Sequence, residues 1–147
     1  MNISHLFIDA TFKIAPKNYY QILNIIGYDE TKNFNMPVFH IIMSNKSFES
    51  YNKIFQEILN LLEEYKIKIN FKNIIINCDF EKSLINAIRN NFKEIKIYGC
   101  YFHYVKALWK KARKLGLTKS KLLSNTKLLI FSFKIYPFIL NKKNKIL

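Results

Sequence analysis

The spacing of hydrophobic residues changes once along this chain, near residue 47, and this change restricts the folds open to it. Before that point the apolar residues form three strand-like runs, at 6–14, 19–28 and 37–43, the last of which opens at Pro37. Beyond that point apolar residues recur every three or four positions, as in an amphipathic helix over 47–65. A strand meander is therefore expected first, followed by a helix.

Strands and helices alternate in the rest of the pattern. Apolar runs at 73–79 and 94–100 predict strands, and helical spacing returns at 84–92 and 102–115. Gly116 then follows as a residue that commonly ends a helix. The predicted order β-β-β-α-β-α-β-α implies an α/β fold, with a mixed five-stranded sheet and helices on its faces.

Charge is distributed unevenly along the 147 residues, whose formal net charge is +14. Residues 1–94 hold all ten acids and 11 of the 24 Lys and Arg residues, whereas residues 95–147 hold 13 basic residues and no acid. Such a basic half attracts phosphate backbones. A solvated lysine-rich face in a sequence biased towards Lys, Asn and Ile is the alternative. The residues expected to contact DNA are Lys106, Lys110, Lys111, Arg113 and Lys114.

Several classes of protein are excluded by composition. Two cysteines are too few for a disulfide framework, and the first nine residues lack the basic and long apolar regions of a signal peptide. The most apolar segment, 128–140, is interrupted by Lys134 and Pro137 and is shorter than the roughly 20 residues of a membrane span. We therefore expect an intracellular chain that is neither secreted nor inserted in a membrane.

Two aspartates occupy positions where a carboxylate needs an explanation. Asp9 interrupts an apolar strand, and Asp79 ends another strand just before a helix. If the first and fourth strands are neighbours, they lie about 4.8 Å apart, and both carboxylates can share one divalent cation. Asp79 as a helix N-cap and Asp9 as a paired structural acid are the alternatives, and the pattern alone leaves them open.

Cys100 and His103 form a Cys-x-x-His pair after the fifth predicted strand. Such a pair supplies two zinc ligands, but a structural zinc site needs four. The other cysteine is Cys78, and the remaining histidines, His5 and His40, are distant in sequence. A strand-end cysteine and an interfacial histidine are the simpler interpretation, so zinc is not expected. His40 is expected to be a packed strand residue.

Three segments resemble the transposase domain of Mutator-like elements (MULE). The segment FIDATFKIAPKNYYQILNIIGYDE is similar to its opening strand pair, and MPVFHIIMSNKSFESYNKIF is similar to its third strand and first helix. The most specific segment, IIINCDFEKSLINAIRNNFKEIKIYGCYFHYVKALWKKARKLGL, carries Asp-Phe-Glu, Gly-Cys-x-Phe-His and Ala-Leu-Trp blocks. The likeness covers roughly residues 5–117, in the family's order and spacing.

The resemblance implies a ribonuclease H-like fold and cut-and-paste DNA transposition by two Asp and one Glu that bind metal. Asp9 falls on the first position of that triad and Asp79 on the second. Cys100 and His103 fall on a Cys-x-x-His motif that lies between the second and third acids and whose role is uncertain. The resemblance also implies Mg²⁺ or Mn²⁺ as cofactor, DNA as partner and a nuclear location.

The chain departs from the family pattern in three ways. Ala10 stands where a glycine is usual, and no acid follows Glu94, so the third acid is missing from its expected place. The family's upstream DNA-binding region is also not found before Met1. We therefore expect residues 1–117 to form a partial transposase core and residues 118–147 to form a basic and apolar tail. One interpretation of this tail is a truncated helical insertion with a helix within 122–140.

Three functional hypotheses follow. The leading one is a transposase core fragment that keeps two metal-binding carboxylates but is inactive alone, unless a homo-oligomer or a second transposase chain supplies the missing Glu. The second is a non-catalytic nucleic-acid-binding or interaction remnant that uses the basic residues 106–121. The third is a small nuclease in which Glu81 substitutes for the third acid, although Glu81 also suits a helix start. No small-molecule substrate is expected.

Overall fold

The computed structural model describes residues 3–116, which belong to two compact units. The first unit spans Met1–Cys100, and the second begins at Tyr101. The first unit contains the whole sheet and two helices, and the described part of the second is a single helix.

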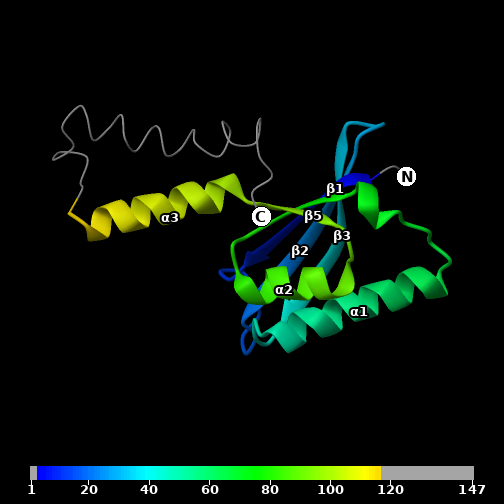
Figure 1. Cartoon of the computed structure of the whole chain (residues 1–147). Helices are drawn as coiled ribbons and strands as arrows, with labels where there is room; N and C mark the ends of the chain where they lie inside the picture. Colours follow the sequence, from blue (N-terminus) through cyan, green and yellow to red (C-terminus); the bar gives the residue numbers. More distant parts are fainter. Residues whose placement is uncertain (1–2, 117–147) are drawn as a thin grey trace. The chain divides into compact units, whose positions relative to one another are not determined.

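The first unit is built on a mixed five-stranded sheet in the order β3-β2-β1-β4-β5 (Figure 1). The strands are β1 (Ile3–Thr11), β2 (Gln21–Asp29), β3 (Phe34–Met43), β4 (Ile75–Cys78) and β5 (Lys96–Gly99). The first three strands pair antiparallel as a meander, whereas β4 pairs parallel with β1 and β5 parallel with β4. The predicted α/β fold class with a mixed five-stranded sheet is confirmed.

Two helices, α1 (Phe48–Glu64) and α2 (Lys82–Asn91), cover one face of the sheet (Figure 1). A short 3₁₀ turn, Phe71–Asn73, precedes β4. Helix α1 begins where expected, because the side-chain oxygen of Ser47 accepts a hydrogen bond from the backbone N–H of Ser50 at 3.2 Å. The second unit contributes α3 (Tyr101–Lys114), which is followed by Gly116 at a φ of 76°.

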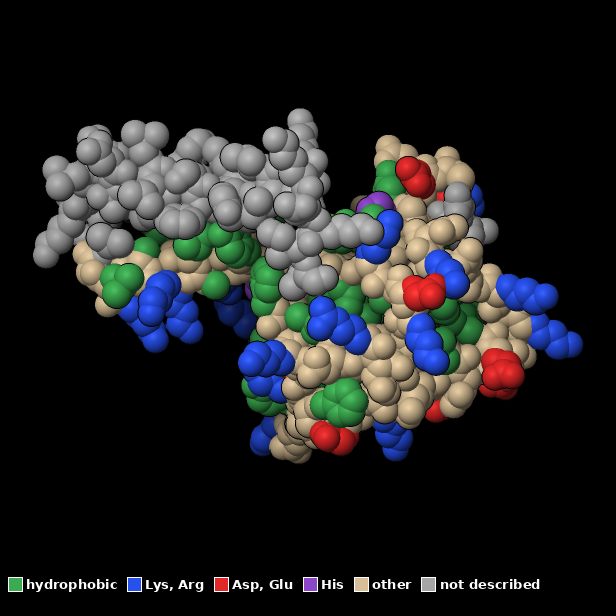
Figure 2. Space-filling model, in the orientation of Figure 1, with side chains coloured by type: hydrophobic (Ala, Val, Ile, Leu, Met, Phe, Trp, Pro, Cys, Tyr) green, Lys and Arg blue, Asp and Glu red, His purple; other side chains and the backbone are tan. Residues whose placement is uncertain are grey.

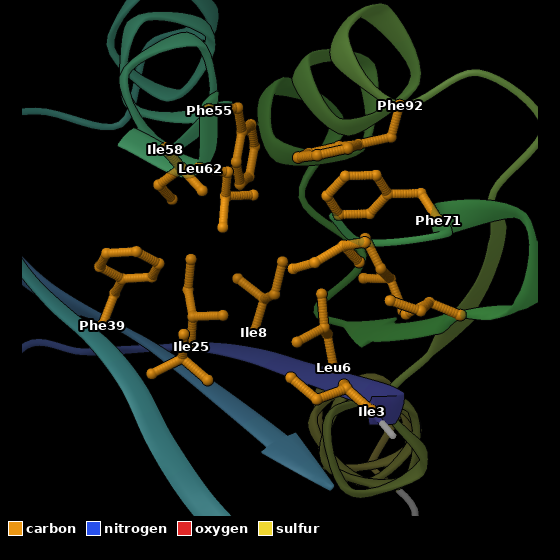
Figure 3. Close-up of a pocket in the computed structure, with 14 residues that line it drawn as sticks. Ile3, Leu6, Ile8, Ile25, Phe39, Phe55, Ile58, Leu62, Phe71 and Phe92 are labelled. Carbon is orange, nitrogen blue, oxygen red and sulfur yellow. The ribbon is translucent and has the colours of Figure 1, made fainter. Parts of the chain in front are cut away.

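The core lies between the sheet and the two helices. Alternate residues of β2 point into it, and Leu23 and Ile25 are almost fully buried there beside Tyr51 and Phe55 of α1. The ring of Phe55 meets that of Phe92 edge to face, with ring centres 5.5 Å apart. Figure 3 shows side chains from strands and helices converging on a small cavity with an entirely apolar lining. An apolar lining of this kind offers no partner for water.

Asp29, at the end of β2, is the one carboxylate among residues 3–116 that is almost fully buried. Its Oδ1 accepts hydrogen bonds from the backbone N–H and the hydroxyl of Thr31, at 3.0 and 2.6 Å, and from the backbone N–H of Lys32 at 3.3 Å. The side chain thereby shapes the turn between β2 and β3.

The third strand differs from the prediction at its start. Pro37 was expected to open the strand, but β3 begins at Phe34 and Pro37 lies inside it. Strand β3 is at the edge of the sheet, and the pairing with β2 shifts beside Pro37, where Ile26 faces Pro37 and Ile25 faces Phe39. An edge strand with a bulge tolerates a residue that cannot donate a hydrogen bond.

Two expectations reach beyond the described residues. The helix considered within 122–140 lies outside them, and the division of the chain into 1–117 and 118–147 stays a prediction for the same reason. Within residues 3–116, none of the helices combines the length and the apolar character needed to cross a membrane.

Candidate functional site

Asp9 and Asp79 each directly follow one member of a residue pair in two neighbouring parallel strands. Ile8 of β1 is paired with Cys78 of β4, and the two aspartates are the residues that follow. Ile8 and Cys78 are buried in the core, and successive side chains of a strand alternate between its faces. Alternation therefore turns Asp9 away from the core, and Asp79 directly follows the last residue of the neighbouring strand β4, at its carboxyl end. The condition that the sequence left open, adjacency of the first and fourth strands, is met.

The chain around Asp79 is held by contacts that continue the sheet. The backbone N–H of Cys100 donates to the carbonyl of Cys78 at 2.7 Å, which extends the pairing of β4 and β5 beyond their ends. The backbone N–H of Phe80 donates to Oδ1 of Asp79 at 2.6 Å and orients the carboxylate. A Cβ atom on Gly99 would overlap the ring of Phe80. Gly99 thus makes room for the residue that directly follows Asp79.

A row of polar residues continues from Asp9 across the same face. Asp9 is paired with Asn24 of β2, and Asn24 is paired with His40 of β3. The Nδ1 atom of His40 lies 2.7 Å from Oδ1 of Asn24, and Nδ2 of Asn24 donates to Oγ1 of Thr11 at 3.3 Å. With Asn24 in this orientation, Nδ1 of His40 is the donor. The row therefore places two further hydrogen-bonding side chains beside the acidic pair.

Sequence reasoning missed this row. Asn24 was not singled out, and His40 was expected to be a packed residue, whereas its side chain is exposed. The alternation of polar and apolar residues could have indicated it, because His40 and Asn24 are both flanked by apolar residues and should therefore face away from the core. That signal cannot tell which residues face each other, because the register of β2 and β3 includes a bulge.

Glu81 lies at the start of α2 and contacts residues on the core side of the sheet. Its Oε2 is 3.9 Å from Nζ of Lys46, in the loop before α1. It also lies near Tyr51, whose hydroxyl accepts a 2.7 Å hydrogen bond from Nε2 of the buried Gln21. Burial raises the pKa of Tyr51 far above its usual value, and the charge of Glu81 adds to this rise. The use of Glu81 as a substitute third acid stays a prediction.

The two cysteines differ in accessibility. Cys78 is buried, and desolvation, followed by the negative charge of Asp79, raises its pKa to about 12. It is therefore a protonated thiol at neutral pH, a poor metal ligand and a poor nucleophile. Cys100 is half-buried at the end of the first unit, and His103 belongs to the second unit. Within residues 3–116 no group of three or more Cys, His, Asp or Glu side chains is arranged to hold a metal ion.

Helix α3 carries a dense positive charge. The five basic residues expected to contact DNA all lie on it and are exposed: Lys106, Lys110, Lys111, Arg113 and Lys114. No acidic residue occurs in 101–116, so no carboxylate on this helix offsets them. In Figure 2 blue side chains stand out from the surface along α3. Nζ of Lys106 lies 5.9 Å from the ring centre of Phe102, itself largely exposed.

Comparison with known proteins gives one family. The sequence model of the MULE transposase domain matches residues 5–107. A search of curated proteins finds no match. Among solved structures, the chain is similar to the HTLV-2 integrase catalytic core domain in complex with magnesium, with 14% identity and a TM-score of 0.38 over 99% of this chain and 90% of that chain. It is also similar to a chain of the simian T-cell lymphotropic virus intasome in complex with PP2A regulatory subunit B56 gamma, with 12% identity and a TM-score of 0.33 over 92% of this chain and 49% of that one.

Proposed function

The chain belongs to the MULE transposase domain family, and on that premise we propose that Asp9 and Asp79 bind one Mg²⁺ or Mn²⁺ ion and direct it at a DNA phosphodiester. The observation that carries this proposal is the parallel pairing of Ile8 with Cys78, the two residues that directly precede Asp9 and Asp79. In a sheet containing parallel strands, ligands commonly bind at the carboxyl ends of those strands, which is where both carboxylates stand.

The donor set suits a hard divalent cation. Mg²⁺ is usually held by one or two carboxylates, with water and phosphate oxygens completing its shell. Asp9 is exposed and Asp79 half-buried, so a DNA phosphate can reach both. When bound, the ion would supply Lewis-acid stabilisation of charge on phosphate oxygens. The chain itself contributes the position of the two carboxylates, fixed by the strand pairing and by the Phe80 hydrogen bond to Asp79.

We propose in addition that Asp9 and Asp79 are too few carboxylates for strand transfer. Residues 95–147 contain no Asp or Glu, and no cluster of three potential ligands occurs among residues 3–116. Loss of one carboxylate from a metal site removes both a ligand and a charge, and such losses strongly reduce activity. We therefore expect little cleavage by this chain alone, and more if a second transposase chain or another copy supplies a carboxylate.

DNA is the partner that the basic residues of α3 favour. Five exposed Lys and Arg residues on fourteen residues of helix would neutralise phosphates and release counterions. This predicts binding to duplex DNA that weakens steeply as salt increases. A nuclear location belongs to the same proposal and is motivated by the family alone.

The charge of α3 also favours a second candidate, a non-catalytic remnant that binds nucleic acid without metal chemistry. The two candidates make different predictions for the aspartates. In a remnant, DNA binding survives the replacement of Asp9 and Asp79, and Mn²⁺ has no specific effect on the folded chain. In a surviving metal site, Mn²⁺ stabilises the chain through those two residues.

The test is the thermal midpoint of the full chain with increasing Mn²⁺, followed by calorimetric titration. A ligand at 100 times its Kd stabilises the folded state by about 2.7 kcal/mol, which raises the midpoint by several degrees. We expect Asp9→Asn and Asp79→Asn each to remove most of this rise. Glu64→Gln, at an exposed site at the end of α1, is the matched control.

Glu81→Gln decides the role of Glu81 in the same experiment. Loss of the Mn²⁺ effect would make Glu81 a third ligand, and an unchanged effect would leave it as a partner of Lys46. If wild-type protein shows no Mn²⁺ effect, or the same effect as both aspartate variants, the metal site is refuted and the non-catalytic remnant takes its place.

A further inference from the structure

The loop between β1 and β2 exposes large hydrophobic side chains. Four residues of this loop form what we call the loop patch, with their exposed fractions in parentheses: Phe12 (51%), Ile14 (69%), Tyr19 (51%) and Tyr20 (44%). Three of them are aromatic. Single exposed apolar residues are common on protein surfaces, whereas four within nine residues form a patch that calls for a partner.

The loop patch is held in a defined shape by backbone hydrogen bonds. The N–H of Ala15 donates to the carbonyl of Phe12 at 3.2 Å, and the N–H of Tyr19 donates to the carbonyl of Pro16 at 3.0 Å. The N–H of Tyr20 donates to the carbonyl of Met43 at 2.8 Å, which ties the loop to the end of β3. These bonds hold the backbone of the loop before any partner binds, so less backbone conformational entropy remains to be lost.

The rings of the patch are arranged with each other and with a lysine. Phe12 and Tyr20 meet edge to face, with ring centres 5.5 Å apart and planes at 87°. Nζ of Lys46 lies 5.9 Å from the ring centre of Tyr20. Lys13 and Lys17 belong to the same loop and are exposed. No acidic residue occurs between Asp9 and Asp29, so both charged residues of the loop itself are lysines.

The patch lies close to the acidic pair along the chain. Phe12 is three residues beyond Asp9, about 10 Å along an extended strand. Figure 1 shows the loop between β1 and β2 at the same end of the sheet as the start of α1, away from the turn that joins β2 to β3.

We propose that the loop patch binds unpaired bases of a DNA strand whose phosphates lie at Asp9 and Asp79. This inference rests on the proposed function and adds a substrate class to it: DNA with unpaired nucleotides next to the reacting phosphate. Flat exposed rings beside lysines suit a single strand, since each base has a face that stacks on an aromatic ring while lysines meet the phosphates. In an intact duplex the base faces are already stacked and do not reach the rings.

The experiment compares two DNA ligands on the full chain without metal: a blunt duplex, and the same duplex with a short unpaired overhang that contains 2-aminopurine. Stacking on a protein ring quenches the fluorescence of 2-aminopurine, and anisotropy reports binding. We expect tighter binding of the overhang, with quenching. Phe12→Ala and Tyr19→Ala should each weaken overhang binding by roughly five- to a hundredfold and leave duplex binding unchanged.

Phe34→Ala provides the matched control, because Phe34 is 59% exposed and lies at the opposite end of β3 from Met43. It should bind both ligands as the wild type does. Asp9→Asn should also retain overhang binding without metal, which separates this inference from the metal site.

Three outcomes would overturn the inference. Equal binding of both ligands, with no effect of Phe12→Ala or Tyr19→Ala, would remove the patch from DNA recognition while leaving the metal site untouched. Self-association that disappears in those two variants would assign the patch to contact with a second copy. Absence of binding to either DNA would reject the patch together with DNA as a partner, whatever the Mn²⁺ titration shows.

Discussion

The two faces of the sheet in the first unit use the same strands for different purposes. On the core face Leu23, Ile25 and Ile76 are at most 4% exposed and pack against α1 and α2. On the opposite face Asp9, Asn24 and His40 lie in register across β1, β2 and β3. Because side chains alternate along a strand, neighbouring residues belong to different faces. Substitutions on one face should therefore change stability, and those on the other should change ligand binding.

The largest effect on stability is expected at Phe55. It is 1% exposed and contacts Phe92, so Phe55→Ala loses buried surface and leaves a cavity. We expect a loss of about 3–5 kcal/mol in the free energy of unfolding, measured by urea denaturation. Phe34→Ala, at an exposed position, should change it by less than about 0.5 kcal/mol. Similar losses in both variants would show that the core is not where the structure places it.

Cys78 provides a pH-dependent test, because it belongs to the core face although it directly precedes Asp79. A rise in its pKa from 9.0 to about 12 reduces the thiolate fraction at pH 8 by about a thousandfold, so alkylation in the folded chain should be correspondingly slow. The raised pKa contributes stability that is complete below pH 9 and is lost as the pH rises towards 12. Mass spectrometry after brief iodoacetamide treatment should find Cys100 modified before Cys78, and the reverse order would place Cys78 at the surface.

Asp29 and Asp9 should respond differently to the same change. Asp29 is 1% exposed and accepts hydrogen bonds from Thr31 and Lys32, so Asp29→Ala leaves those donors without their acceptor. We expect a cost of about 1–3 kcal/mol. Asp9 is exposed, and Asp9→Ala should cost less than about 1 kcal/mol while removing Mn²⁺ binding. Thermal unfolding with and without Mn²⁺ measures both effects, and a larger stability loss for Asp9 than for Asp29 would contradict the comparison.

A small effect on stability is expected at Gly99. The atom that a new Cβ would meet is the outer end of the Phe80 ring, and Phe80 is 48% exposed, so the ring can turn away. Gly99→Ala should therefore cost less than about 1 kcal/mol. The donor to the Asp79 carboxylate is the backbone N–H of Phe80, which rotation of the ring leaves in place, so Mn²⁺ affinity should be retained. A marked loss of Mn²⁺ affinity measured by calorimetry would show that the backbone of Phe80 shifts together with its ring.

Most of the fold could be predicted from the sequence. The helix expected over 47–65 is observed as Phe48–Glu64 with Ser47 as its N-cap, and all five strands are present in the expected order. The errors lie at strand ends. Pro37 is inside β3 and does not open it, because the strand is at the sheet edge and bulged. Whether a strand is central or at an edge depends on the order of strands in the sheet, which local patterns do not contain.

The candidate site could be predicted only in part. Asp9 and Asp79 were identified from their positions in apolar runs and from the family resemblance. The adjacency of β1 and β4, the pairing of Asn24 with His40 and the burial of Asp29 depend on strand order and register, and one residue of slip reverses which face a side chain occupies. The residues of the loop patch were predicted to belong to the strands at 6–14 and 19–28, and only the structure shows that they are exposed in a loop.

The sequence by itself determined the element types, the uneven charge and the family, because these depend on residue identity and on spacing over a few positions. The tertiary structure decided which distant residues meet. It paired Ile8 with Cys78, the residues that precede the two aspartates, placed Glu81 near Lys46 and Tyr51, and left the rings of Phe12 and Tyr19 half exposed. The physical reason is that strand order and register follow from packing of the whole core against α1 and α2, a sum of many weak contacts that no short segment encodes.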